Sequence, residues 1–227
     1  MSESIINTPS LTIPVDSEHG ALRLSVVGIF VGIWLVIFAV SNRLVTSEGF
    51  NLIAFFLAFV VAGVATRVSE QYLQKRWPSG RVVEMNADSI EVRSKTKVQD
   101  KIDAREPFSV LLWRFQTKKR SRVPKGWFVI ACALEQDDTY LSVYTFASPT
   151  DAEMLQKQFK FTTLASEKNA NAKDVRQDSL RFAGEQRRLK LAETFRWNSG
   201  AEMSMADFET FLNRLNGQFS QWMPSNR

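Results

Sequence analysis

The segment "SNRLVTSEGFN" (Ser41–Asn51) separates two long apolar runs and decides how the chain folds. The sequence contains no charged residue from Leu24 to Asn42, and none from Gly49 to Thr66. A helix needs roughly 17–25 mostly apolar residues to cross a bilayer core, so each run is long enough. The short linker between them forces an antiparallel arrangement. We therefore predict a transmembrane helical hairpin over residues 23–70, with spans at about 24–42 and 50–66.

Two other interpretations of the apolar runs fit less well. Core helices of a soluble domain usually carry polar residues on one face, whereas both runs are apolar all round. A cleaved signal peptide would use "FAVS" (Phe38–Ser41) as its cleavage site. Signal cores are about 7–15 residues long and follow a positively charged segment. The segment before the first run instead contains acidic residues and only Arg23 as a strong positive charge.

The distribution of Lys and Arg predicts the orientation of the hairpin. The tip carries only Arg43, whereas the opposite ends of the spans carry Arg23, Arg67, Lys75, Arg76 and Arg81. Positive charges next to spans are enriched on the cytoplasmic side. We therefore expect an integral membrane protein with two spans and both termini in the cytoplasm, the first 22 residues forming a polar tail.

Small residues recur at helical spacing in both spans. Gly28 and Gly32 form a pair in the first span, and Ala54, Ala58 and Ala62 follow one another at intervals of four in the second. Small side chains allow helix backbones to approach closely within a bilayer. We expect these positions to pack the two spans together, or alternatively to make a homo-oligomer through Gly28 and Gly32.

Beyond the hairpin, residues 77–227 are predicted to form a mostly antiparallel α+β domain. "WPSG" (Trp77–Gly80) ends the second helix, because Pro and Gly together interrupt helices. Expected strands are "RVVEMN" (81–86), "SIEVRS" (89–94), "FSVLLWRFQ" (108–116), "GWFVIACAL" (126–134), "TYLSVYTFA" (139–147) and "RLKLAETFRW" (188–197). Their alternation of apolar residues, or their content of aromatic and β-branched residues, is typical of strands.

Two helices complete the predicted domain. Ser148 followed by Pro149 marks the start of the first. The second begins near Ser204, with apolar residues at helical spacing from Phe208 to Trp222. The segment from 165 to 179 has almost no large apolar residue and is expected to be a loop or a poorly ordered insertion.

The layout of short meandering strands followed by a terminal helix resembles the pleckstrin-homology superfold. A membrane hairpin followed by such a domain resembles the bacterial PH-like domain membrane proteins. The resemblance covers residues 77–222 in layout only, and the polar insertion before "RLKLAETFRW" departs from the simplest pattern. It implies a small β-barrel with a terminal helix that is used for binding or assembly, and it transfers no functional residue.

The sequence contains few residues suited to catalysis. The only histidine, His19, precedes the first span, and the single cysteine, Cys132, lies in an apolar run. A His/Cys metal site or a Ser-His pair would lack ligands or a base. The glycines beyond the hairpin are too scattered for a phosphate-binding loop. We therefore expect no cofactor, no metal and no enzymatic activity, with a carboxylate-based membrane-bound hydrolase as the remaining enzymatic alternative.

One basic segment is the most informative polar feature of the domain. "RFQTKKRSRVPKGW" contains Arg114, Lys118, Lys119, Arg120, Arg122 and Lys125 with no acidic residue between them. It falls between two predicted strands, where it could simply protect a sheet edge. A domain held at a membrane would place these charges near anionic headgroups, each contributing about 1 kcal/mol. Tethering at a bilayer argues against nucleic acid as the partner of this chain, whose net charge is +5.

These observations lead to one functional expectation and one alternative from a different class. We expect a membrane-anchored, non-enzymatic protein whose PH-like domain binds anionic lipid or a protein partner at the membrane surface. The alternative is a structural or assembly subunit of a membrane complex, in which the domain or its last helix contacts another protein.

Overall fold

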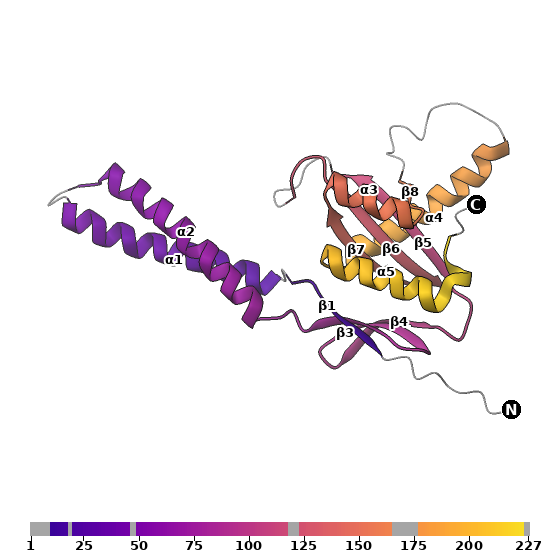
Figure 1. The fold of residues 1–227 in the computed structure, drawn as a ribbon. Helices are drawn as coiled ribbons and strands as arrows, with labels where there is room; N and C mark the ends of the chain where they lie inside the picture. Colours follow the sequence, from indigo (N-terminus) through magenta and orange to yellow (C-terminus); the bar gives the residue numbers. More distant parts are fainter. Residues whose placement is uncertain (1–9, 18–19, 46–48, 118–122, 165–176, 225–227) are drawn as a thin grey trace. The chain divides into compact units, whose positions relative to one another are not determined.

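The computed structural model describes residues 10–17, 20–45, 49–117, 123–164 and 177–224. The chain divides into two units (Figure 1). One unit is the helical hairpin, residues 16–79, and the other combines residues 1–15 with residues 80–227.

The hairpin consists of α1 (Gly20–Val45) and α2 (Leu52–Arg76), as the two apolar runs predict. Both helices are long and apolar enough to cross a membrane. At the tip, Gly49 has a φ of +95°, a backbone conformation that glycine adopts readily. The Asn51 side chain caps α2 by accepting hydrogen bonds from the Ile53 and Ala54 N–H groups. The tip therefore satisfies backbone groups that the start of a helix leaves unpaired.

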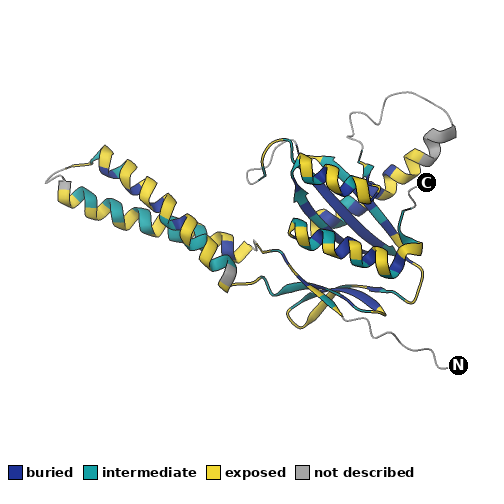
Figure 2. Cartoon of the chain, viewed as in Figure 1, coloured by how far each residue is buried: buried dark blue, intermediate teal, exposed yellow. Residues whose placement is uncertain are grey.

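The two helices pack through small and aromatic side chains. Ala54, Ala58 and Ala62 are buried on α2, and edge-to-face contacts join Phe30 to Phe59 and Trp34 to Phe55, each at 5.2 Å between ring centroids. Most of the exposed large apolar side chains of the described residues belong to these two helices (Figure 2). Such a surface is typical of contact with lipid rather than with water.

The second unit contains two sheets. The smaller, sheet A, has the order β1-β2-β3-β4 and is antiparallel throughout. Its strands are β1 (Leu11–Val15), β2 (Arg81–Met85), β3 (Ser89–Ser94) and β4 (Lys97–Asp103). The prediction of a polar tail over residues 1–22 is wrong for β1, whose alternate residues Ile13 and Val15 are buried. The domain therefore begins before the hairpin, and a fragment starting at residue 77 would lack one edge of sheet A.

The larger sheet, sheet B, has the order β8-β5-β6-β7-β9. Its strands are β5 (Ser109–Gln116), β6 (Phe128–Gln136), β7 (Thr139–Ala147), β8 (Thr162–Thr163) and β9 (Ala201–Glu202). The three long strands form an antiparallel meander, and the two short strands add to its edges in parallel. Within the described residues the sheets do not close, so the expected barrel is absent.

Helices cover both faces of sheet B. They are α3 (Pro149–Gln158), α4 (Gln177–Ser199), α5 (Met205–Phe219) and the short 3₁₀ helix η1 (Ser220–Trp222). The predicted start signals are correct, because Ser148 and Ser204 accept hydrogen bonds from the N–H groups of Asp151 and Asp207. Residues 165–176 of the predicted insertion lie outside the described residues, and residues 177–179 begin α4.

The prediction of a strand over "RLKLAETFRW" is wrong, because these residues belong to α4. The alternating residues Leu191 and Trp197 are 47% and 67% exposed, so alternation does not describe the buried face. The buried residues are Gln186, Leu189, Ala192 and Arg196, which recur at helical spacing. A polar and a charged residue occupy two of these four positions, which concealed the helical pattern.

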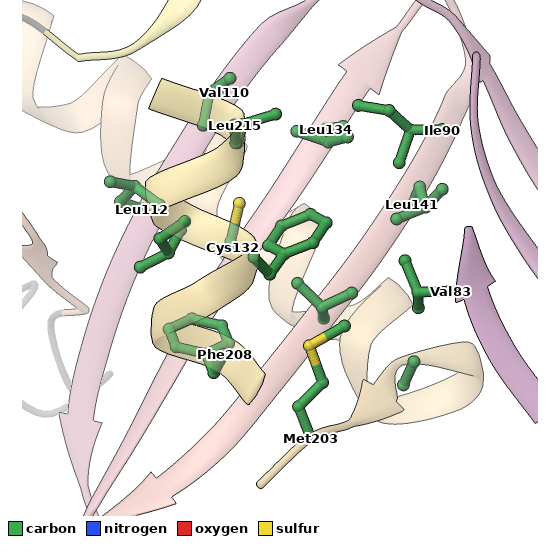
Figure 3. Packing of buried hydrophobic residues seen from close by; sticks show 14 of the residues in the cluster. Val83, Ile90, Val110, Leu112, Cys132, Leu134, Leu141, Met203, Phe208 and Leu215 are labelled. Carbon is green, nitrogen blue, oxygen red and sulfur yellow. The ribbon is translucent and has the colours of Figure 1, made fainter. Parts of the chain in front are cut away.

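The main core lies between sheet A, one face of sheet B, and the helices α3 and α5. Figure 3 shows α5 crossing the strands of sheet B, with Phe208 and Leu215 beside Cys132 and Leu134, while Val83 and Ile90 enter from sheet A. A smaller cluster lies under α4 on the opposite face, where Trp113, Ala131 and Leu189 meet. Sheet B is therefore buried on both faces.

A buried charge pair fixes α4 to sheet B. The Arg196 side chain is 3% exposed, and its guanidinium donates two hydrogen bonds to the Glu193 carboxylate, at 2.7 and 2.6 Å. The same carboxylate accepts a hydrogen bond from Trp113 Nε1 at 3.0 Å. The guanidinium also lies 4.6 Å from the ring centroid of Tyr144. Breaking such a pair leaves an uncompensated buried charge, which is strongly destabilising.

The contribution of β1 to the domain gives a first prediction. Ile13→Ala removes a buried side chain from the core, so it is expected to lower the free energy of unfolding by about 2–5 kcal/mol. Urea denaturation of the full chain in detergent, followed by tryptophan fluorescence, measures this. The control is Thr12→Val, at the exposed neighbouring position, with an expected change within about 0.5 kcal/mol. Equal stability of both variants would contradict a structural role for β1.

The buried charge pair gives a second prediction. Glu193→Ala leaves the Arg196 charge unpaired and the Trp113 N–H without its acceptor, so the expected loss of stability is about 3–5 kcal/mol. The same denaturation measurement applies. Arg187→Ala, at an exposed position of the same helix, is expected to stay within about 0.5 kcal/mol. A loss for Glu193→Ala no larger than that of Arg187→Ala would contradict the proposed anchoring of α4.

Candidate functional site

A groove of about 640 Å³ runs along the edge of sheet B at the beginning of β5. Its volume falls within the range of roughly 300–1,000 Å³ that is typical of ligand sites. The lining residues come from five segments: residues 107–112, 135–137, 160–162, 185–189 and 221–224. Segments that are remote in the sequence therefore meet at this edge.

The floor of the groove is a strand edge that no other strand covers. On its outer side β5 pairs with β8 only at Trp113 and Arg114. Among the described residues, no strand pairs with Ser109–Leu112 on the side away from β6. Uncovered strand edges present backbone N–H and C=O groups that can pair with another chain.

One wall of the groove is formed by α4. Arg188 and Leu189 follow Glu185 by three and four residues, so both lie on the same side of the helix as Glu185. The Glu185 carboxylate accepts a hydrogen bond from the Thr162 hydroxyl at 2.8 Å. This contact joins the wall to β8, the short strand that bounds the uncovered part of the edge.

The opposite wall is formed by the end of α5 and by η1. Gln221, Trp222 and Pro224 line the groove on this side. The Trp222 ring lies 5.9 Å from the Phe108 ring, and Phe108 in turn contacts Phe219 at 5.5 Å between ring centroids. The aromatic contacts give this wall an apolar surface, in contrast to the charged surface of α4.

The charges of the groove are biased towards acid. Its lining includes the carboxylates of Glu135, Asp137 and Glu185 and the basic side chains of Lys160 and Arg188. Arg188 forms an ion pair with Glu135. Burial and the hydrogen bond to Glu135, 2.5 Å from its hydroxyl, raise the pKa of Tyr140 to about 12. Tyr140 is therefore a neutral donor that fixes the position of the Glu135 carboxylate.

The predicted basic site is at the other end of β5. Arg114 is half-buried, with its guanidinium carbon 5.3 Å from the Phe128 ring centroid, and Lys125 is exposed. Lys118, Lys119, Arg120 and Arg122 lie outside the described residues. Since β5 runs from the groove at Ser109 to this connection after Gln116, the basic segment and the groove are separate features.

The predicted helix-packing residues fall into two groups. Ala54, Ala58 and Ala62 are buried in the hairpin, where α2 contacts α1. Gly28 and Gly32 are exposed, and a Cβ added to either would meet nothing within 4 Å. The two glycines therefore lie on the outer surface of α1 and take no part in packing between the two helices.

The described residues offer no assembled metal site, since they contain no group of three or more His, Cys, Asp or Glu placed to hold an ion. Cys132 is buried in the main core. Burial raises the pKa of its thiol above the ordinary range, so the reactive thiolate is suppressed.

Sequence reasoning did not identify the groove. Its only visible sign was the strand "FSVLLWRFQ" itself, because the incomplete cover of that strand depends on where β8 begins. The turn at Asp137 and Asp138 connects β6 to β7, and Asp137 lines the groove. Arg188 and Leu189 were assigned to a strand and Glu185 to no element, so their shared face was not recognised.

No family model, curated protein or solved structure matches this chain. The resemblance to PH-like membrane proteins therefore remains an expectation drawn from the layout of the elements.

Proposed function

We propose that this chain is a membrane-anchored, non-enzymatic binding protein whose sheet domain recognises a protein partner. The groove at the beginning of β5 carries this proposal, since it combines an uncovered strand edge with an apolar wall and a charged wall. Recognition of extended protein segments commonly uses these elements, with backbone hydrogen bonds for affinity and side-chain pockets for specificity.

The hairpin is proposed as the anchor. Its two helices are long and apolar enough to cross a bilayer, and their outward surfaces expose apolar side chains. β1 precedes the hairpin and pairs with β2, which follows it. Both flanks of a spanning hairpin would therefore lie on one side of the membrane. The excess of Lys and Arg at these flanks supports the cytoplasmic side.

The charge of the groove favours a protein partner over anionic lipid at this site. Three carboxylates face two basic side chains there, so a phosphate headgroup would meet like charges. Lipid binding by the basic segment from Arg114 to Lys125 remains a second proposal at a different place on the domain.

The three acids of the groove are also compatible with the alternative of a carboxylate-based hydrolase. It is less well supported, because Arg188 and Tyr140 already occupy the Glu135 carboxylate.

Cysteine labelling tests the proposed anchor. A cysteine at Ser47, in the tip, is expected to react with a membrane-impermeant maleimide added to intact cells. A cysteine at Val98, an exposed position of β4, is expected to react only after lysis. The native Cys132 is buried and serves as an internal negative control. Labelling of the Val98 position in intact cells, with none at Ser47, would reverse the proposed orientation.

Photo-crosslinking in native membranes tests partner binding. p-Benzoylphenylalanine at Gln221, an exposed residue of the groove wall, is expected to give a discrete, light-dependent protein adduct. The matched control is the same group at Val98 on sheet A, where no discrete adduct is expected. A third probe at Lys125 reports on the basic segment, and mass spectrometry identifies each product.

The three probe positions separate the alternatives. A protein adduct at Lys125 with none at Gln221 would move the binding surface to the basic segment. Lipid adducts alone at Lys125, with no protein adduct at either position, would favour the lipid-binding function. No adduct above the level seen at Val98 would contradict both proposals.

A further inference from the structure

The hydrogen-bonding groups of β5 alternate between its two sides. The Leu164 N–H donates to the Arg114 carbonyl at 2.9 Å, so even-numbered residues of β5 direct their backbone groups towards β8. The Thr117 N–H donates to the Trp127 carbonyl at 2.8 Å, which places odd-numbered positions towards β6. Continued along the strand, this alternation directs the N–H and C=O of Val110, and the N–H of Leu112, to the uncovered side.

These backbone groups lie on the floor of the groove, between the wall on one face of the sheet and the wall on the other. Val110 and Leu112 are buried towards the main core, whereas Leu111 packs towards α4. A strand added beside them would point alternate side chains towards Trp222 on one wall and towards Glu185 and Arg188 on the other. An extended segment beside Val110 would lie between the two walls, and four of its residues would span roughly 13 Å.

The two walls also indicate the kind of occupant. A second copy of β5 would carry its own α4 on one face and its own α5 on the other. These helices would make the second strand too thick to enter the groove. A lone extended peptide has no such cover. The Trp222 wall suits an apolar side chain. The carboxylates of Asp137 and Glu185 form no ion pair within the described residues, so the α4 side suits Lys or Arg.

We propose that the partner supplies an extended peptide segment that adds to sheet B as a strand beside Val110, in line with β8. The segment alternates apolar residues towards Trp222 with a basic residue towards Glu185. This inference rests on the proposed function and specifies its ligand as an extended peptide that is recognised chiefly through its backbone. The short strand β8 pairs in parallel with the same edge at Trp113 and Arg114, so this edge accepts a parallel strand.

Val110→Pro tests this inference with little disturbance to the fold. Proline keeps an apolar side chain at a buried position and removes the N–H that faces the uncovered edge. The ladder with β6 is formed by the neighbouring odd-numbered residues, so it is retained. Val110→Ala is the matched control, because it shortens the side chain and keeps the N–H. Thermal denaturation of both variants verifies that they fold.

The probe is a library of random decapeptides displayed on phage and selected on the full chain in nanodiscs. Enriched peptides are expected to bind the wild type and Val110→Ala with similar affinity, and Val110→Pro at least tenfold more weakly. N-methylation of the bound peptides is expected to weaken binding at alternate residues only. As a direct test of charge, Glu185→Gln is expected to weaken peptides that carry Lys or Arg.

Three results would overturn strand addition. They are equal binding to Val110→Pro, an N-methylation effect without alternation, and a crosslink between two copies of this chain at Gln221. A protein adduct at Gln221 together with peptides that ignore Val110→Pro would leave the proposed function intact and reject only the strand. Absence of both the adduct and peptide enrichment would reject the two proposals together.

Discussion

The ladder between β1 and β2 is the constraint on which the rest of the structure depends. It joins residues on either side of the hairpin, with Val15 opposite Arg81. Closing a loop of this length costs conformational entropy, although the cost rises only slowly with length. Burial of Ile13 and Val15 in the main core offsets that cost. Because the ladder joins both flanks of the hairpin, the domain is continuous across an inserted helical unit.

Sheet B is covered more completely on its faces than along its edges. Its three long strands are bounded by strands of two residues each, and these cover only part of either edge. On both faces the sheet is sealed by helices, which bury Trp113 under α4 and Cys132 under α5. The edge beside Ser109–Leu112 is therefore one part of sheet B with which no described strand pairs. The elements that cover the two faces also form the two walls of the groove.

Composition and periodicity predicted the parts of the fold that single segments specify. The hairpin followed from the two runs without charge, and Ser148 and Ser204 marked the starts of α3 and α5 because their caps are local. β1 was missed because "LTIPV" is short and contains Pro14, which is tolerated at the edge of a sheet. β4 carries mostly exposed polar residues and buries only Ile102, so it has no apolar alternation to detect.

The assignment of α4 and the location of the groove failed for a related reason. In α4 the buried face includes Gln186 and Arg196, and Arg196 is acceptable there only because Glu193 neutralises it. That compensation depends on Trp113 and Tyr144, which are far away in the sequence. The groove likewise assembles residues from five segments. Features of this kind arise from tertiary contacts, and no local pattern encodes them.

The ladder between β1 and β2 also imposes an order on biosynthesis. β1 leaves the ribosome first, yet its partner emerges only after residues 16–80 have been made. During that interval the apolar side chains of Ile13 and Val15 have no core to join. The two flanks of the hairpin must meet before sheet A is complete. Completion of the domain therefore waits until the whole hairpin has been synthesised, and until then β1 has no partner strand.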